Sequence, residues 1–141
     1  MSLNTTLVQR SFTMFEERPN ELVKTFLDIL LSKHPTLRRL FDHANVDNFQ
    51  ESFFHTLRLA VDHLDDLEKL ESHFLQVGIR HAQRGVKQKY FSPVCESMLE
   101  AMEIVAGDRW DDEMEKAWDE LLGVLAVIIK NGIRQSEVSV R

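Results

Sequence analysis

The sequence of 141 residues contains a single cysteine, Cys95, and this scarcity excludes an internal disulfide. A lone thiol is typical of chains that work in a reducing compartment, so we expect a cytoplasmic protein. No apolar run is long enough to cross a bilayer, and the first residues, MSLNTTLVQRSF, lack a basic stretch followed by an apolar block. We therefore expect neither a membrane span nor a secretory signal.

Positive charge is also scarce in this chain. Lys and Arg total 17 against 23 Asp and Glu, which gives a formal net charge of -6 at pH 7. The basic residues form no long stripe, so we expect no nucleic-acid partner. The sequence has no HExxH, CxxC, GxSxG or phosphate-cradling glycine loop, and the enzyme classes that depend on those motifs are therefore excluded.

The residues that are plentiful indicate one helical globular domain over residues 1–141. Hydrophobic residues make up 43 % and charged residues 28 % of the chain. Apolar residues recur at helical spacing throughout, and no alternating strand pattern occurs, so the sequence predicts an all-α fold. The core is expected over about 4–133, and the C-terminal tail SEVSVR is expected to be disordered. The expected helices cover residues 4–16, 19–34, 36–41, 46–63, 67–84, 91–106 and 111–132.

One predicted helix, 67–84, places a histidine on its apolar face. At about 100° per residue, His81 points in nearly the same direction as the leucines three to four turns before it. Two interpretations remain open from spacing alone. His81 is either a core histidine whose ring nitrogens are hydrogen-bonded, or a ligand of a metal. The other residues of this face are Leu67, Leu70, Phe74, Val77 and Gly78.

Several motifs occur along the chain in a distinctive order. They are HPTLRRLF, in which a phenylalanine follows the proline by six residues, then DDLEKLESHFLQVGIRHAQRGV, then FSPV, and a final helix that contains AW. This order resembles that of globins, specifically the single-domain haemoglobin group that includes bacterial haemoglobins, flavohaemoglobin haem domains and neuroglobin. The resemblance covers residues 7–133. It implies a globin fold that holds haem b (iron protoporphyrin IX) between two facing helices.

The resemblance also implies the roles of individual residues. His81 matches the proximal iron ligand, and the carbonyl of Val77, one turn earlier, is a candidate acceptor for its other ring nitrogen. Phe41 matches the phenylalanine that packs flat on the haem. Arg84 is either a partner for a haem propionate or a solvated surface residue. The remaining implied contacts with the cofactor are Leu27, Phe49, Phe53, Val86, Phe91 and Val94.

The distal side departs from typical globins, which offer bound O2 a hydrogen bond from a histidine, glutamine or tyrosine. The ungapped count from His81 places Phe49 at the distal position, and neither Phe53 nor Leu27 supplies a donor either. A shift of one residue would place Gln50 there and make the pocket polar. We favour Phe49 because it belongs to an unbroken apolar stripe, and an apolar pocket implies weaker retention of O2. The stripe consists of Val46, Phe49, Phe53, Leu57 and Val61.

The proximal side departs as well. Flavohaemoglobins and their bacterial relatives carry a tyrosine and a glutamate around the proximal histidine, and the matching positions here are Phe91 and Ile133. Tyr90 is one residue out of register. Peroxidase-like or nitric oxide dioxygenase chemistry therefore loses its expected support. The chain has no flavin or nicotinamide fingerprint, so any reduction of the iron requires an external electron donor, which the sequence does not identify.

These observations favour a haem protein that reversibly binds a diatomic gas, O2, CO or NO, for sensing, scavenging or transport. The alternative is a nitric oxide dioxygenase or peroxidase-like enzyme that depends on an external reductase. A third interpretation, a globin that has lost haem, is disfavoured because such proteins usually lack the proximal histidine. A homodimer and a fusion to a signalling domain both remain open.

Overall fold

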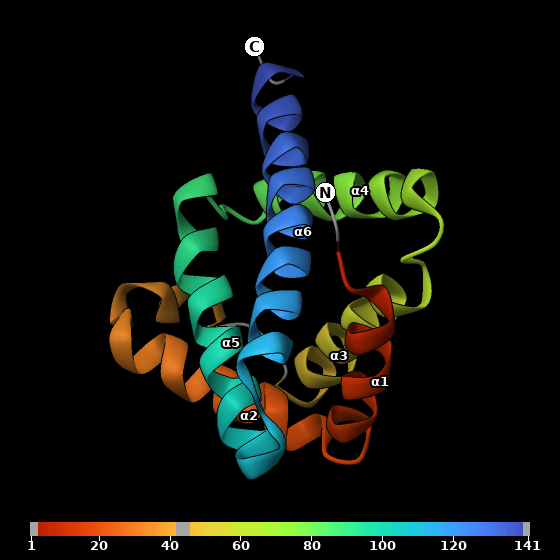
Figure 1. Cartoon of the computed structure of the whole chain (residues 1–141). Helices are drawn as coiled ribbons and strands as arrows, with labels where there is room; N and C mark the ends of the chain where they lie inside the picture. The colour runs from red at the N-terminus through yellow and green to blue at the C-terminus, as the bar shows by residue number, and fades with distance from the viewer. Residues whose placement is uncertain (1–2, 42–45, 140–141) are drawn as a thin grey trace.

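The structure, a computed structural model, describes residues 3–41 and 46–139, without the side chains of residues 46, 47, 138 and 139. Every regular element in these ranges is helical and none is a strand, so the predicted all-α fold is confirmed. Figure 1 shows their arrangement. In chain order the elements are α1 (Thr5–Glu16), α2 (Pro19–Lys33), the 3-10 helix η1 (Pro35–Phe41), α3 (Val46–Asp62), α4 (Leu67–Gln83), η2 (Gln88–Tyr90), α5 (Phe91–Ala106), η3 (Gly107–Arg109) and α6 (Asp112–Ser139).

Local side-chain chemistry explains where the helices begin. Asn4 accepts a hydrogen bond from the backbone N–H of Leu7 at 3.0 Å and caps α1. Asp66 and Asp111 cap α4 and α6 in the same way, at 3.1 and 2.8 Å. Each of these oxygens satisfies a backbone N–H that the helix itself leaves without a partner. The acidic pairs 65–66 and 111–112 in the sequence predict caps at these two helix starts, and one aspartate of each pair makes the cap.

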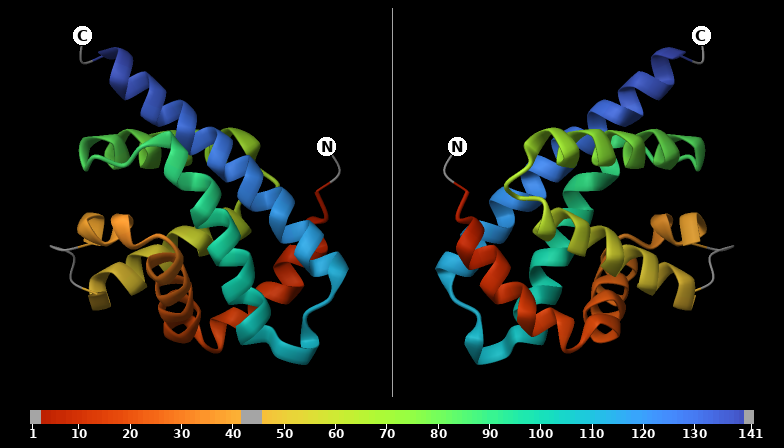
Figure 2. Two further views of the ribbon diagram at one scale, coloured as in Figure 1. Left: turned by 90° about the vertical axis from the view of Figure 1, so that its left-hand side faces the viewer. Right: turned by 90° about the vertical axis from the view of Figure 1, so that its right-hand side faces the viewer.

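Helices α3 and α4 do not pack closely on each other. α4 packs chiefly against α6, and α2 packs chiefly against α5, whereas the close helix pairs of the described chain do not include α3 with α4. In Figure 2 these two helices approach each other at the turn that joins them and diverge toward their other ends. The sequence predicts that haem lies between two facing helices, which are α3 and α4. Each of them is held mainly by other helices.

The centre of the core is an aromatic cluster around Trp118, which is fully buried on α6. The ring centroids of Phe15 and Phe12 lie 6.1 and 6.2 Å from it, and Phe12 stacks on Phe54 of α3 at 5.3 Å. The indole N–H of Trp118 donates to the hydroxyl of Ser11 at 2.9 Å, and this hydroxyl donates to the Leu7 carbonyl at 2.7 Å. A buried polar pair therefore fixes α1 against α6.

Two sequence predictions about helix ends and faces are wrong. The last helix does not close near Asn131–Gly132, because α6 continues to Ser139. Residues 136–139 of the tail expected to be disordered are thus helical, and residues 140–141 lie outside the described residues. Gly132 does not end the helix because it lies in a close contact with α4, and Ile133 is fully buried directly after it. Leu67, expected on the inner face of its helix, is 68 % exposed because α4 begins with this residue, before the helix reaches the core.

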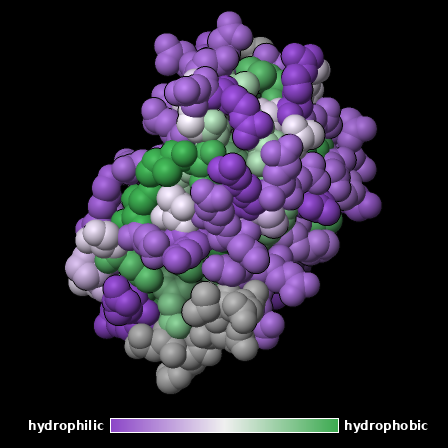
Figure 3. Space-filling view, turned by 90° about the horizontal axis from the view of Figure 1, so that it is seen from below, coloured by the Kyte–Doolittle hydropathy of each residue, from purple (hydrophilic) through white to green (hydrophobic). Residues whose placement is uncertain are grey.

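The described surface is mostly polar. Hydrophilic side chains cover most of the face seen in Figure 3, and hydrophobic ones show between them. Ile104 on α5 and Val127 on α6 are each 58 % exposed. Among the described helices, none is both long enough and apolar enough to serve as a membrane span.

The buried pair between Ser11 and Trp118 gives a test of the core. Replacing Ser11 with Ala leaves the Trp118 indole N–H buried without an acceptor, so we expect the free energy of unfolding to fall by about 1–3 kcal/mol in urea denaturation. Thr13→Ala is the matched control, since Thr13 is exposed and its hydroxyl donates only to the Arg10 carbonyl of the same helix. Its effect should stay within about 0.5 kcal/mol. Equal losses in the two variants would contradict this account.

Candidate functional site

The imidazole of His81 is held in one orientation by its own helix. His81 is partly buried, near the C-terminal end of α4, and its Nδ1 lies 2.7 Å from the carbonyl oxygen of Val77. A carbonyl only accepts hydrogen bonds, so Nδ1 carries the proton and the lone pair resides on Nε2. The structure gives Nε2 no hydrogen-bond partner among the residues that it describes. The ring therefore presents an available donor atom for a metal.

The turn that follows fixes the backbone of the same residue. The carbonyl oxygen of His81 accepts from the N–H of Arg84 at 3.0 Å and from the N–H of Val86 at 3.1 Å. Gly85 adopts a φ of 84°, a left-handed conformation that permits this tight reversal. The side chain of Arg84 is exposed, and Val86 packs against a buried cluster beside the helix. His81 is thus fixed at its side chain and at its main chain.

The electrostatic setting favours the neutral form of the His81 ring. Burial lowers its pKa below the usual value of 6.5, and the charges of Arg84 and Arg80 lower the pKa further, against the hydrogen bond to Val77, which raises it. A neutral imidazole is the form that binds a metal. The exposed Arg84 therefore acts on His81 through its charge, and the structure shows no ion pair for it among the described residues.

The side of His81 toward α5 and α6 is apolar. Phe91, Ala126 and Ile133 are buried together, and the ring centroid of Phe91 lies 6.3 Å from that of His81. Cys95 is half-buried beside the same cluster, and burial raises the pKa of its thiol. The Phe91 and Ile133 positions, where the resemblance expects a tyrosine and a glutamate, are thus occupied by side chains that pack and make no hydrogen bonds.

Aromatic side chains from η1, α2 and α3 form a second apolar cluster. Phe41, at the end of η1, contacts Phe49 of α3 edge-on with ring centroids 5.2 Å apart. Phe49 lies 5.6 Å from Phe53, which stacks on Phe26 of α2 at 5.1 Å. Leu27 is partly buried against the same core. None of these side chains has a hydrogen-bond donor.

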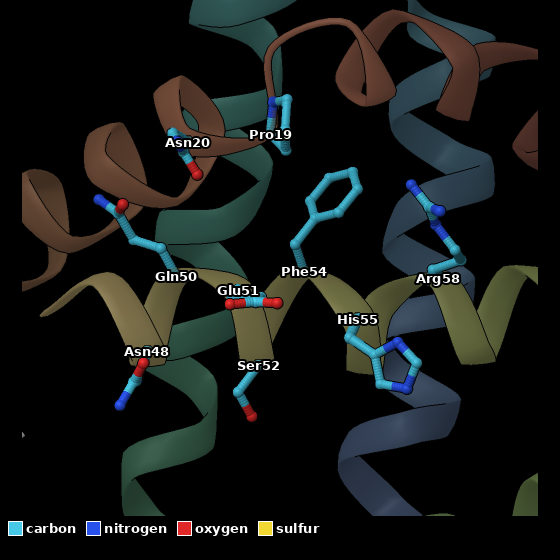
Figure 4. A pocket seen from close by; sticks show the side chains of 9 residues that line it. All are labelled: Pro19, Asn20, Asn48, Gln50, Glu51, Ser52, Phe54, His55 and Arg58. Atoms are coloured by element: carbon cyan, nitrogen blue, oxygen red, sulfur yellow. The ribbon is translucent and has the colours of Figure 1, made fainter. Parts of the chain in front are cut away.

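Gln50 lies on a different face of α3 from this aromatic cluster. It lines an open surface groove of about 890 Å³ between α3 and the start of α2, together with Asn20 and Phe54. Figure 4 shows Gln50 and Phe54 on the side of α3 toward Pro19 and Asn20. The local geometry therefore brings Phe49, and not Gln50, into the aromatic cluster.

The residues present fit a flat apolar group that carries its own metal. Within the described part of the chain no three His, Cys, Asp or Glu side chains gather to hold an ion, so a metal here needs ligands from elsewhere. A porphyrin supplies them and needs one axial imidazole together with apolar walls. Several apolar side chains that the resemblance assigns to the cofactor are only partly buried: Leu27, Phe41, Phe49, Phe53, Val86 and Val94.

Some features of this site were not predicted as parts of it. Phe26 lies on the buried face of α2, and its stacking on Phe53 adds a fourth ring to the aromatic cluster. Gly78 was counted as an apolar-face residue, yet its lack of a side chain permits close approach of α6. The sequence signal for this close contact is the glycine itself, three residues before His81.

Comparison with known proteins gives the family directly. The family profile described as Globin matches residues 24–129. The chain belongs to the globin family, and it has the all-α globin fold that the sequence motifs predict.

Individual relatives agree with this membership. The chain is 30 % identical over 122 residues to a Flavohemoprotein of Bacillus thuringiensis. The matched region covers 85 % of this chain and 30 % of that protein. It therefore spans about a third of the length of such relatives. Leghemoglobin-1 of Vicia faba is 29 % identical over 133 residues, 88 % of this chain and 92 % of that one. A bacterial globin from Campylobacter jejuni has a TM-score of 0.84 at 18 % identity, covering 95 % and 96 % of the two chains. These haem-protein relatives imply a haem cofactor.

The lowered pKa of His81 predicts how the stability of the apoprotein depends on pH. The unfolded chain takes up a proton near pH 6.5, whereas the folded chain resists protonation until a lower pH. Below about pH 6.5 the unfolded state therefore binds more protons, and stability falls as the pH falls. The slope from this group is at most about 1.4 kcal/mol per pH unit.

The measurement is urea unfolding of the apoprotein at about pH 7.5 and about pH 5.5, for the natural chain and for His81→Gln. The variant should lose less stability on acidification, because glutamine does not titrate. His73, whose pKa is also lowered chiefly by burial, is present in both proteins and cancels in the comparison. An identical pH dependence in the two proteins would contradict the assignment of a lowered pKa to His81.

Proposed function

We propose that this chain binds haem b between α3 and α4, with His81 Nε2 as the proximal ligand, and that it binds a diatomic gas reversibly. The observation that carries the proposal is Nε2 of His81, which has no hydrogen-bond partner in the part of the chain that the structure describes and is set by the hydrogen bond from Nδ1 to the Val77 carbonyl at 2.7 Å. When bound, haem supplies an iron with one open coordination position for O2, CO or NO. Val86 and Val94 would contact the apolar face of the group, and Arg84 lies near enough to His81 to place a positive charge beside a propionate.

The aromatic cluster of Phe41, Phe49 and Phe53 would affect which gas binds most tightly. Phe41, Phe49 and Phe53 would cover the open side of the site without offering a hydrogen bond. A ligand that becomes polarised, as O2 does, loses a charge-assisted hydrogen bond of about 1.5–3 kcal/mol in such a pocket. CO and NO depend less on that donor. The pocket therefore favours CO and NO relative to O2.

The surroundings of His81 support binding over oxidative chemistry. Its Nδ1 donates to a neutral backbone carbonyl, and no carboxylate makes this contact. Phe91 and Ile133, buried beside it, offer no acceptor that would draw the proton away and increase electron donation to iron. We further propose that an external electron donor keeps the iron reduced and that the protein works in the cytoplasm, a location that fits its single thiol.

Removing the proposed ligand tests the haem site. His81→Gly should lose the Soret band of a five-coordinate histidine-ligated ferrous haem, and added imidazole should restore it because the free base can fill the vacated space. The control is His73→Ala, which removes a partly buried histidine two turns earlier on the same helix. It should retain the natural spectrum. A natural chain without a Soret band, or an unchanged spectrum in His81→Gly, would refute the proposal.

Adding a donor to the distal cluster tests the proposed choice of gas. Phe49→Gln should slow O2 dissociation by roughly 10- to 150-fold, the equivalent of about 1.5–3 kcal/mol, and should change CO dissociation much less. Stopped-flow ligand displacement measures both rates. Gln50→Ala is the matched control, because Gln50 lines the outer groove, and its rates should equal those of the natural protein. Faster O2 dissociation in Gln50→Ala would place Gln50 at the ligand and overturn the assignment.

A nitric oxide dioxygenase that uses an external reductase is the second candidate. Its support is the likeness to a Flavohemoprotein, of which this chain covers 30 %. The apolar pair of Phe91 and Ile133 disfavours it. Rapid catalytic consumption of NO by the haem-loaded protein with a reductase would establish this second function, and stoichiometric binding without turnover would exclude it.

A further inference from the structure

Helices α4 and α6 cross at a point where both contribute a glycine. A Cβ atom on Gly78 would overlap the carbonyl oxygen of Ile129 and lie 3.0 Å from the Cα of Gly132. A Cβ atom on Gly132 would overlap the carbonyl oxygen of Leu75 and lie 3.0 Å from the Cα of Gly78. The two backbones are therefore in direct contact, and there is no room for a side chain at either of these two positions.

This crossing lies within one turn of the proposed ligand. Gly78 directly follows Val77, whose carbonyl orients His81, and it precedes His81 by three residues. α6 is the chief neighbour of α4, while α3 is not among the helices that pack closely on it in the described chain. The position of His81 thus depends mainly on how α4 rests against α6.

We propose that the Gly78–Gly132 crossing positions His81 before haem binds, so that the proximal helix is already ordered in the apoprotein. The inference rests on the proposed function, because it concerns the haem ligand, but its first test needs no haem. Gly78 lies about 60° around the helix from His81. A side chain at Gly78 would therefore displace α4 sideways from α6 and tilt the imidazole, without moving it straight back from the haem.

The first test is amide hydrogen exchange on the natural apoprotein. If α6 holds α4, the amides of residues 78–82 should exchange at least about 100-fold more slowly than in an unstructured peptide, although no haem is present. Exchange of these amides at the rate of an unstructured peptide would overturn the proposal. This measurement needs neither a variant nor a cofactor, so its outcome is separate from that of the haem proposal.

The second test uses Gly78→Ala and Gly132→Ala, each in a Gly123→Ala background. Gly123 is exposed on α6, and a Cβ atom added there would meet no other atom within 4 Å. Gly123→Ala should therefore raise helix stability, and alone it serves as the matched control. The crossing variants should show a shifted or broadened iron–histidine stretching band by resonance Raman spectroscopy. They should also lose haem roughly tenfold faster than the control.

The combined results separate the two proposals. A natural chain that binds no haem refutes the proposed function, and the exchange experiment still decides whether α6 orders α4. A natural chain that binds haem, with an iron–histidine band unchanged in both crossing variants, refutes the positioning role. If neither crossing variant folds, the exchange experiment on the natural apoprotein decides the question.

Discussion

The hydrogen bond from His81 Nδ1 to the Val77 carbonyl is the interaction on which the functional geometry depends. It selects the tautomer, directs Nε2 away from the backbone of α4, and spans one turn of a single helix at 2.7 Å. Since donor and acceptor belong to the same helix, the orientation survives any rigid movement of α4. What it cannot set is where α4 lies, and this comes from the contact with α6. The orientation of the imidazole is therefore set within α4, and its position is set by the packing of α4 on α6.

The two sides of the site share one chemical character. Phe41, Phe49 and Phe53 form one apolar cluster, and Phe91 and Ile133 belong to another beside His81. Among the described residues, the ring of His81 hydrogen-bonds only to its own main chain. In such a site the reactivity of a bound metal is set by the axial imidazole and by low polarity. Under the proposed function, such surroundings would offer a bound metal few of the acids and bases that proton-coupled chemistry needs.

Much of this structure could be predicted from the sequence because its causes are local. Apolar spacing gave the helices, Asp66 and Asp111 marked two of their starts, and the motif order gave the family. The hydrogen bond between Val77 and His81 followed from one-turn spacing. The length of α6 was missed because Gly132 was interpreted as a helix end. A glycine that ends a helix and a glycine that admits a neighbouring backbone look the same until the neighbour is known.

The contact between Gly78 and Gly132 also limits how this chain can vary. In an ordinary core, enlarging one side chain can be offset by shrinking the one opposite, and pairs of positions drift together through such compensatory exchanges. Here each partner is already the smallest residue, and the obstacle is the opposing main chain itself. No second substitution can make room for a first. A residue larger than glycine at either position therefore requires the two main chains to move apart, whereas most other positions of α4 and α6 face neighbouring side chains or solvent.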